Sequence, residues 1–274
     1  MDNNLSRTLS PLESKVILPL EWLEQPIISR PEIVDVLDGS TQRADRVIRS
    51  LLAKNWLERL SNGRYLLIPA NRGPEAIRDS NMLAIGRYFV EPYYFAYATA
   101  AAHYRFTSQS RTTVWIAATK QIPDRTVRDT CFRFIGLVSR KFFGYAATKV
   151  FNEGVDMSDR EKTVIDCVDR PDLAGGIGEV TRIVARAARE LNWDTFSKYA
   201  VQFDSITMVQ RFGYLARRAS VGVPSDCLRQ LRSLLRKNSR SFLASTRRWG
   251  KTGHYDPEWQ VIVNVPDREI MSEI

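Results

Sequence analysis

The segment SRPEIVDVLDGSTQRADRVIRSLLAKNWLERLSNGRYLLIP, residues 29–69, decides the fold expected for the first part of the chain. Its first residues, Ser29 and Glu32, form an S-x-x-E capping box, and Pro31 lies in the first turn, where its missing N–H costs nothing. A short helix is therefore expected from there to about residue 37. The side chains expected to be buried on this helix are Ile33, Val36 and Leu37.

A second helix is expected directly after a tight turn at residues 38–40. Gly39 can adopt the positive φ that ends one helix before the next begins, and Ser40 or Thr41 can cap the second helix. Apolar residues then recur at i, i+3, i+4 and i+7, which predicts one buried stripe. The residues of this stripe are Ala44, Val47, Ile48 and Leu51.

A β-hairpin is expected immediately after the second helix. The dipeptide Asn62-Gly63 separates the strand-like runs at residues 56–60 and 64–68, and Asn-Gly in that position strongly favours a hairpin. Two helices joined by a tight turn and followed by a hairpin are typical of a winged helix-turn-helix. We assign this predicted domain to residues 1–73.

Charge is unevenly distributed along this predicted domain. Residues 1–39 contain three basic and seven acidic residues, whereas residues 40–73 contain seven basic and two acidic ones, a net charge of +5. Arg and Gln near the start of a helix can form bidentate hydrogen bonds to base edges, and further cations can hold phosphates. The alternative is a solvated helix face in a domain that binds protein. The candidate DNA-binding residues are Thr41, Gln42, Arg43, Arg46, Arg49, Lys54, Asn62 and Arg64.

A leading helix is expected from a second capping box at Ser10 and Glu13, with Pro11 at its first position. Pro19 lies inside this helix and should kink it, because proline removes one backbone hydrogen bond. The face expected to be buried consists of Leu12, Val16, Leu20 and Leu23.

The rest of the chain predicts a second, larger domain at residues 74–274, after a boundary at residues 71–74. Strands are expected at 113–119, 132–138, 149–151 and 259–265. Helices are expected at 77–87, 96–104, 179–191, 193–203, 206–219 and 226–236, and a third capping box at Ser158 and Glu161 should begin another. The expected fold class is therefore α+β: a winged helix-turn-helix followed by a mixed α/β domain that ends in a helix-rich region.

The net charge of +9 is concentrated at residues 205–254, which contain eleven basic residues and one acidic residue. This basic segment predicts an auxiliary phosphate-binding surface for a polyanionic partner. The alternative is that its cations pair with the acids of residues 153–179. The candidate phosphate-binding residues are Arg217, Arg218, Arg232, Arg236 and Lys237.

The composition is that of a soluble globular protein, with 44% hydrophobic and 26% charged residues. The first fifteen residues lack the features of a signal peptide, and no apolar run is long enough for a membrane span, so no membrane partner is expected. Three widely spaced cysteines indicate neither a zinc site nor a disulfide framework. These features predict a cytoplasmic protein.

The sequence does not indicate catalysis. The two histidines, His103 and His254, lie in no nucleophile motif, and the glycines at 175–178 lack the Lys-Ser/Thr of a phosphate-binding loop. No metal site, no cofactor and no enzymatic activity are therefore predicted. The alternative is a nuclease, or another nucleic-acid enzyme targeted by the winged helix, whose divalent metal would be held by an acidic cluster at residues 159–172. That cluster comprises Asp159, Glu161, Lys162, Asp166, Asp169 and Asp172. On a helix, however, Lys162 and Asp166 would form an ordinary i,i+4 pair.

Most of the chain resembles the AbiEi-type antitoxins and transcriptional regulators of type IV toxin–antitoxin systems. The resemblance is carried by the N-terminal helices and hairpin, the aromatic and alanine-rich stretch at 93–104, and the strand around Trp115. It continues through residues 159–166, Arg170-Pro171, Gly175-Gly176, residues 210–215 and the final segment at 255–265.

The resemblance implies an autorepressor that binds inverted repeats in its own promoter. It also implies a C-terminal domain, residues 74–274, that counteracts a nucleotidyltransferase-like toxin encoded beside it, as part of phage defence. In that family the antitoxin often acts without forming a stable complex with the toxin.

Overall fold

The computed structural model describes residues 8–23, 25–61, 63–70, 82–108, 112–127, 129–150 and 153–272. The chain divides into two compact units, residues 1–88 and 89–274. The boundary expected at residues 71–74 lies outside the described residues. None of the helices in the described ranges is long and apolar enough to cross a membrane.

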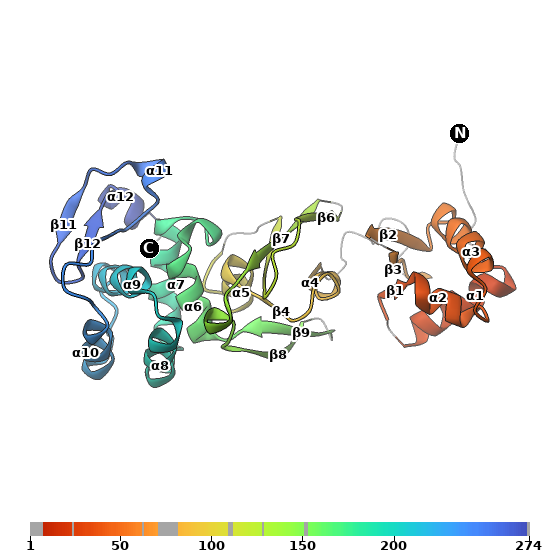
Figure 1. Ribbon diagram of the computed structural model, residues 1–274, viewed down its shortest axis with the longest axis horizontal. Coiled ribbons are helices and arrows are strands. Elements are labelled where there is room, and N and C mark those ends of the chain that lie inside the picture. The colour runs from red at the N-terminus through yellow and green to blue at the C-terminus, as the bar shows by residue number, and fades with distance from the viewer. Residues whose placement is uncertain are drawn as a thin grey trace. The chain divides into compact units, whose positions relative to one another are not determined.

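The N-terminal unit contains helices and a small antiparallel sheet (Figure 1). The sheet has the strand order β1-β3-β2. The elements, in chain order, are α1 (Pro11–Trp22), β1 (Ile27–Ser29), α2 (Arg30–Val36), α3 (Thr41–Ala53), β2 (Leu57–Ser61), β3 (Arg64–Leu67) and α4 (Met82–Gly86).

Local capping signals define the helix starts in this unit. Both expected capping boxes are confirmed: the backbone N–H groups of Ser10 and Ser29 each donate to a glutamate oxygen three residues later at 2.6 Å. Ser40 caps α3, because its hydroxyl accepts from the N–H of Arg43. The turn before α3 has positive φ at two residues, Asp38 (60°) and Gly39 (76°). These bonds satisfy backbone donors that a helix start leaves unpaired.

The buried face of α1 differs from the expected one. Val16 and Leu20 are buried, but Leu12 and Leu23 are 37% and 66% exposed. Glu13 and Ile17 take the inner positions instead. The expected face was partly wrong because it excluded a glutamate, and Glu13 is buried against a lysine that follows α3.

The α2–α3 pair forms the main part of the core in this unit. The four stripe residues of α3 are all buried, as expected, and Ile33 and Leu37 pack in the same cluster. Val36 is 39% exposed and does not belong to the core, contrary to the expectation. The hairpin of β2 and β3 is confirmed, with Gly63 at φ 76°; Asn62 lies outside the described residues.

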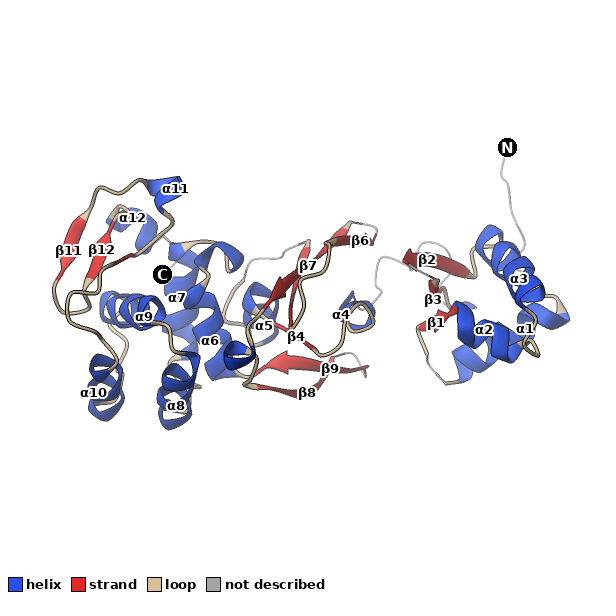
Figure 2. Cartoon of the chain, in the orientation of Figure 1, coloured by secondary structure: helices blue, strands red, loops and turns tan. Residues whose placement is uncertain are grey.

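The C-terminal unit is built on a six-stranded mixed sheet with the order β6-β7-β5-β4-β9-β8 (Figure 2). β4 and β5 are antiparallel, whereas β4 pairs with β9 and β5 with β7 in parallel. The strands are β4 (Tyr93–Phe95), β5 (Thr113–Ala118), β6 (Arg125–Val127), β7 (Thr130–Gly136), β8 (Tyr145–Val150) and β9 (Glu153–Ser158). The strands β4, β6 and β9 are additions to those expected from the sequence.

Helices of the C-terminal unit pack around α6, whose residues 161–168 are all buried. The core that they share includes α7, α8 and α9 and the aromatic pair Phe196 and Phe212, with ring centroids 4.4 Å apart. The helices are α5 (Tyr97–His103), α6 (Arg160–Asp169), α7 (Ile177–Ala187), α8 (Trp193–Phe203), α9 (Ile206–Arg218), α10 (Ser225–Ser233), α11 (Thr246–Trp249) and α12 (Asp267–Ile270).

A three-stranded sheet completes the C-terminal unit. Its strands are β10 (Ser241–Phe242), β11 (His254–Asp256) and β12 (Val261–Val263), in the order β10-β12-β11. Trp259, 1% exposed, precedes β12 and packs on α9 at Gly213. A Cβ at Gly213 would overlap the indole ring, so the close approach requires glycine there.

The start of α6 also differs from the expectation. Asp159, not Ser158, is the N-cap, and its carboxylate accepts from the N–H of Lys162 at 2.8 Å. The Glu161 carboxylate accepts instead from the N–H of Asn192 at 2.6 Å, so no capping box forms. Ser158 is fully buried, and its hydroxyl lies 2.8 Å from that of Thr163.

Candidate nucleic-acid interface

The outer face of α3 presents polar and cationic side chains to solvent. Its inner face is buried in the core of the N-terminal unit, which fixes the direction in which the other side chains project. Five of the candidate residues are exposed on this outer face: Thr41, Gln42, Arg43, Arg46 and Arg49.

The arginines of this face have few internal partners. The guanidinium of Arg43 lies 3.5 Å from the carboxylate of Asp38, a solvent-exposed pair in which both side chains remain about half exposed or more. Arg49 Nε donates to the carbonyl of Asp45 at 3.3 Å. Arg46 forms no ion pair with any other residue in the described ranges. Exposed pairs of this kind contribute little to stability, so these guanidinium groups can change partners at low cost.

A bidentate ion pair positions α3 relative to the hairpin. Arg30 donates to both carboxylate oxygens of Asp45, at 2.7 and 2.9 Å, and the Arg30 backbone N–H donates to the carbonyl of Gly63 at 2.6 Å. The hydrogen bond from Arg30 and its charge lower the pKa of Asp45. One residue at the start of α2 therefore contacts both α3 and the β2–β3 turn. No sequence pattern signals this contact, because fifteen residues separate the two partners.

Lys54 does not belong to the exposed set. Expected to hold a phosphate, it instead donates to both carboxylate oxygens of Glu13, at 2.8 and 2.9 Å. The Glu13 side chain is 3% exposed. Lys54 therefore joins the end of α3 to α1, and its charge is already neutralised.

The hairpin adds further cations to the unit. Arg64 is exposed at the start of β3, and Arg59 on β2 lies over the ring of Tyr65 at 5.7 Å. Asn62, the remaining candidate, lies outside the described residues. The candidates that the structure leaves exposed are thus Thr41, Gln42, Arg43, Arg46, Arg49 and Arg64.

Four of the five candidate phosphate-binding residues in the basic segment have acidic neighbours within the C-terminal unit. Arg217 on α9 and Arg232 on α10 both donate to Glu258, and Arg217 also donates to Asp256. Two of the five candidate phosphate-binding residues thus have acidic partners within the unit. Arg217 and Arg232 join α9 and α10 to the segment that precedes β12.

The other two arginines of the expected set also have acidic neighbours. Arg218 donates to Asp267 at 2.9 Å, and Arg236 lies 4.0 Å from Asp204. Only Lys237, of the expected set, has no ion pair among the described residues. The alternative expected the pairing acids at residues 153–179; the acids that pair with these four arginines come instead from residues 204–267.

The acidic cluster at residues 159–172 does not converge on one point. Asp159 caps α6 and accepts from the hydroxyl of Tyr199, and Glu161 binds a backbone N–H. Asp169 pairs with Lys141 at 2.8 Å, and Asp172 pairs with Arg170. No group of three or more His, Cys, Asp or Glu in the described part is arranged to hold a metal ion. The structure thus provides no support for the metal-dependent nuclease alternative.

Lys162 and Asp166 form a buried ion pair, not the ordinary surface pair that their i,i+4 spacing suggested. Their side chains are 0% and 1% exposed. Lys162 Nζ also donates to the hydroxyl of Tyr94 at 2.8 Å, which joins α6 to β4. Burial lowers the pKa of Lys162 and raises the pKa of Asp166. The pair is enclosed by protein on all sides and is part of the core.

Comparison with known proteins gives a structural likeness. No protein-family model matches the chain, and no curated protein matches it. The crystal structure of the RV2827C protein from Mycobacterium tuberculosis is similar to this chain, with a TM-score of 0.64 over 94% of this chain and 93% of that one. The two sequences are 16% identical, so this likeness shows the fold alone.

Proposed function

We propose that the N-terminal unit is a winged helix-turn-helix that binds duplex DNA through α3 and the β2–β3 hairpin. The observation that carries this proposal is the exposed cationic face of α3, opposite a fully buried apolar face. In such domains the second helix enters the major groove with its N-terminal residues nearest the bases, and the hairpin contacts the backbone. Gln42, Arg43 and Arg46 lie in the first half of α3, where base contact is expected.

The Arg30–Asp45 pair supports this division of roles. It fixes α3 against α2 and the turn of the hairpin, so the cations of both elements are held in one arrangement before DNA arrives. Preorganisation of this kind reduces the entropic cost of binding. Arg49 and Arg64 are assigned to phosphates, because they lie further along α3 and on the hairpin.

We further propose that the whole chain is an autorepressor and antitoxin of a type IV toxin–antitoxin system. The support is the sequence resemblance to AbiEi-type regulators together with the two-unit organisation. Repression is assigned to the N-terminal unit, and antagonism of a nucleotidyltransferase-like toxin to the C-terminal part. The two activities are expected to be separable.

Two measurements on the full chain test the DNA-binding proposal. Fluorescence anisotropy with a duplex from the chain's own promoter, against a scrambled duplex of equal length, should show tighter binding to the promoter without added magnesium. Equal binding to both duplexes would contradict the proposal that the chain is a sequence-specific repressor. Capture of a protein partner by the exposed α3 face, with no DNA binding, would favour the alternative of a protein-docking domain.

The antitoxin proposal is tested by co-expression with the neighbouring toxin. The full chain should restore growth, and so should a chain lacking residues 1–73, checked for folding by circular dichroism. A matched full-length variant, Arg43→Ala with Arg46→Ala, should lose repression and keep rescue. Failure of the folded fragment and of the full-length variant to rescue would show that the activities are not divided in this way.

A further inference from the structure

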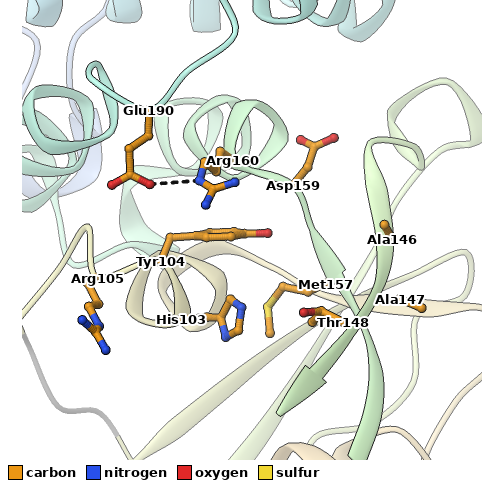
Figure 3. Close-up of a pocket in the computed structure, with 10 residues that line it drawn as sticks. All are labelled: His103, Tyr104, Arg105, Ala146, Ala147, Thr148, Met157, Asp159, Arg160 and Glu190. Atoms are coloured by element: carbon orange, nitrogen blue, oxygen red, sulfur yellow. Dashed lines mark hydrogen bonds and ion pairs between the residues drawn. The ribbon is translucent and has the colours of Figure 1, made fainter.

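A pocket of about 590 Å³ lies in the C-terminal unit, where the end of α5, the start of α6 and the strands β8 and β9 meet. Figure 3 shows Arg160 over the flat side of Tyr104, His103 beneath that ring, and Arg105 at the edge. Ala147, Thr148 and Met157 form the opposite wall. The volume is within the range of small-molecule sites and is larger than an inorganic anion needs.

The guanidinium group of Arg160 is held in a fixed position on one side of this pocket. The guanidinium carbon of Arg160 lies 5.1 Å from the ring centroid of Tyr104, and its Nε donates to Glu190 at 3.0 Å. The Tyr104 hydroxyl donates to the carbonyl of Ser158 at 2.9 Å, which fixes the ring. The guanidinium face turned away from Tyr104 is therefore a preformed flat surface, and such surfaces stack on nucleic-acid bases.

Hydrogen-bond donors exceed free acceptors around the pocket. The terminal nitrogens of Arg160 and the whole guanidinium of Arg105 have no hydrogen bond to another residue in the described ranges. Asp159, by contrast, already accepts through both oxygens, from the Lys162 N–H and the Tyr199 hydroxyl, each at 2.8 Å. An acceptor-rich group such as a phosphate matches this surplus, because guanidinium groups bind phosphate through paired hydrogen bonds.

His103 adds a polar group with both a donor and an acceptor. Its ring lies edge-on to Tyr104, with centroids 5.0 Å apart. Burial and the charge of Arg160 lower the pKa of His103, which favours the neutral imidazole. A neutral imidazole can accept from or donate to a ribose hydroxyl or a base edge.

We infer that this pocket binds a nucleoside phosphate, with the base stacked on Arg160 and the phosphate held by the guanidinium groups of Arg160 and Arg105. The ligand chemistry is shared by a free mononucleotide and by one nucleotide of a single-stranded nucleic acid. The site belongs to the C-terminal unit, whereas the proposed duplex-binding surface belongs to the N-terminal unit. A ligand bound in this pocket would allow the C-terminal unit to respond to nucleotides.

Calorimetric titration of the full chain tests this inference, with the four ribonucleoside 5′-monophosphates as probes. Arg160→Gln and Arg105→Gln should each weaken binding about tenfold, since each removes charge-assisted hydrogen bonds. Arg186→Gln, an exposed arginine on α7 outside the pocket, is the matched control and should leave binding unchanged. Circular dichroism checks that every variant is folded.

Two further titrations distinguish a free mononucleotide from a single strand, and the contribution of the base from that of the phosphate. A single-stranded pentanucleotide that binds while mononucleotides do not, and that loses affinity in Arg160→Gln, would identify a strand as the source and support the site. Ribose 5-phosphate or inorganic phosphate binding as tightly as the mononucleotides would overturn the stacking of a base. Absence of binding by mononucleotides and pentanucleotide, or equal weakening in Arg186→Gln, would overturn the inference as a whole.

Discussion

Lys54 Nζ lies 2.8 and 2.9 Å from the two carboxylate oxygens of Glu13, and this pair joins the end of α3 to the first turn of α1. The same carboxylate accepts from the N–H of Ser10, which makes it part of the helix cap. One glutamate therefore satisfies a helix start and neutralises a cation on another helix. That combination explains why a charged side chain occupies a core position.

The Glu13 pair predicts a specific acid sensitivity. Burial alone would raise the pKa of Glu13, but hydrogen bonds from Lys54, Ser10 and Ser50 outweigh it and lower the pKa from 4.5 to about 2. Because the pKa is lower in the folded state, the stabilisation is fully present above about pH 4.5 and disappears as the pH falls toward 2. It amounts to roughly 3 kcal/mol at most.

Glu13→Gln measures this contribution. We expect the variant to have a lower free energy of unfolding than the parent at pH 7, and the difference to shrink toward pH 2. Urea denaturation followed by circular dichroism at several pH values provides the comparison. A difference that does not change between pH 7 and pH 2 would contradict the role assigned to the ionised carboxylate.

The buried pair of Lys162 and Asp166 predicts strong non-additivity. Lys162→Met leaves the Asp166 carboxylate buried without its cation, so we expect a decrease of about 3–5 kcal/mol in the free energy of unfolding. Removing both charges, with Asp166→Leu added, should restore much of that decrease, because no uncompensated charge remains. Chemical denaturation of the single and double variants gives the coupling. Additive decreases would show that the two side chains do not act as a pair.

Arg43 and Arg46 should determine operator preference. Each lies in the first half of α3 with its guanidinium exposed, so we expect either alanine variant to bind the operator about 1–3 kcal/mol more weakly and random DNA almost unchanged. Anisotropy titrations on both duplexes measure the two changes. Arg64→Ala is the matched comparison, since removing a phosphate contact should weaken both duplexes alike. If the Arg43 and Arg46 variants weaken binding to both duplexes equally, these arginines contact DNA phosphates rather than bases.

Local signals in the sequence were sufficient to predict α1, α2, α3 and the β2–β3 hairpin, whereas the strand β1 was not expected. The caps at Ser10, Ser29 and Ser40 and the positive φ at Gly39 depend on residues within four positions of one another, so a single sequence contains the evidence. The stripe of α3 is equally local, because 3.6-residue periodicity decides which face is buried.

Long-range contacts were the source of the errors. Glu13 could be recognised as buried only with its partner 41 residues away, so the predicted face of α1 was partly wrong. An i,i+4 pair has the same spacing whether exposed or buried, which is why the spacing of Lys162 and Asp166 suggested a surface pair. The pocket around Tyr104 joins segments from α5, α6 and β8–β9, and no sequence pattern connects them.

The last prediction concerns the remaining cations of the basic segment. Arg217 and Arg232 both have Glu258 as an acidic partner, whereas Lys237, Arg247 and Lys251 are exposed and form no ion pair among the described residues. If this segment binds phosphates, these three residues neutralise them. Reversing them to Glu should flatten the slope of log affinity against log salt by roughly 0.9 for each phosphate that is no longer neutralised on duplex DNA. Arg232→Gln should instead leave the slope unchanged, because Glu258 already balances that charge; a flattened slope in that variant alone would reverse the assignment.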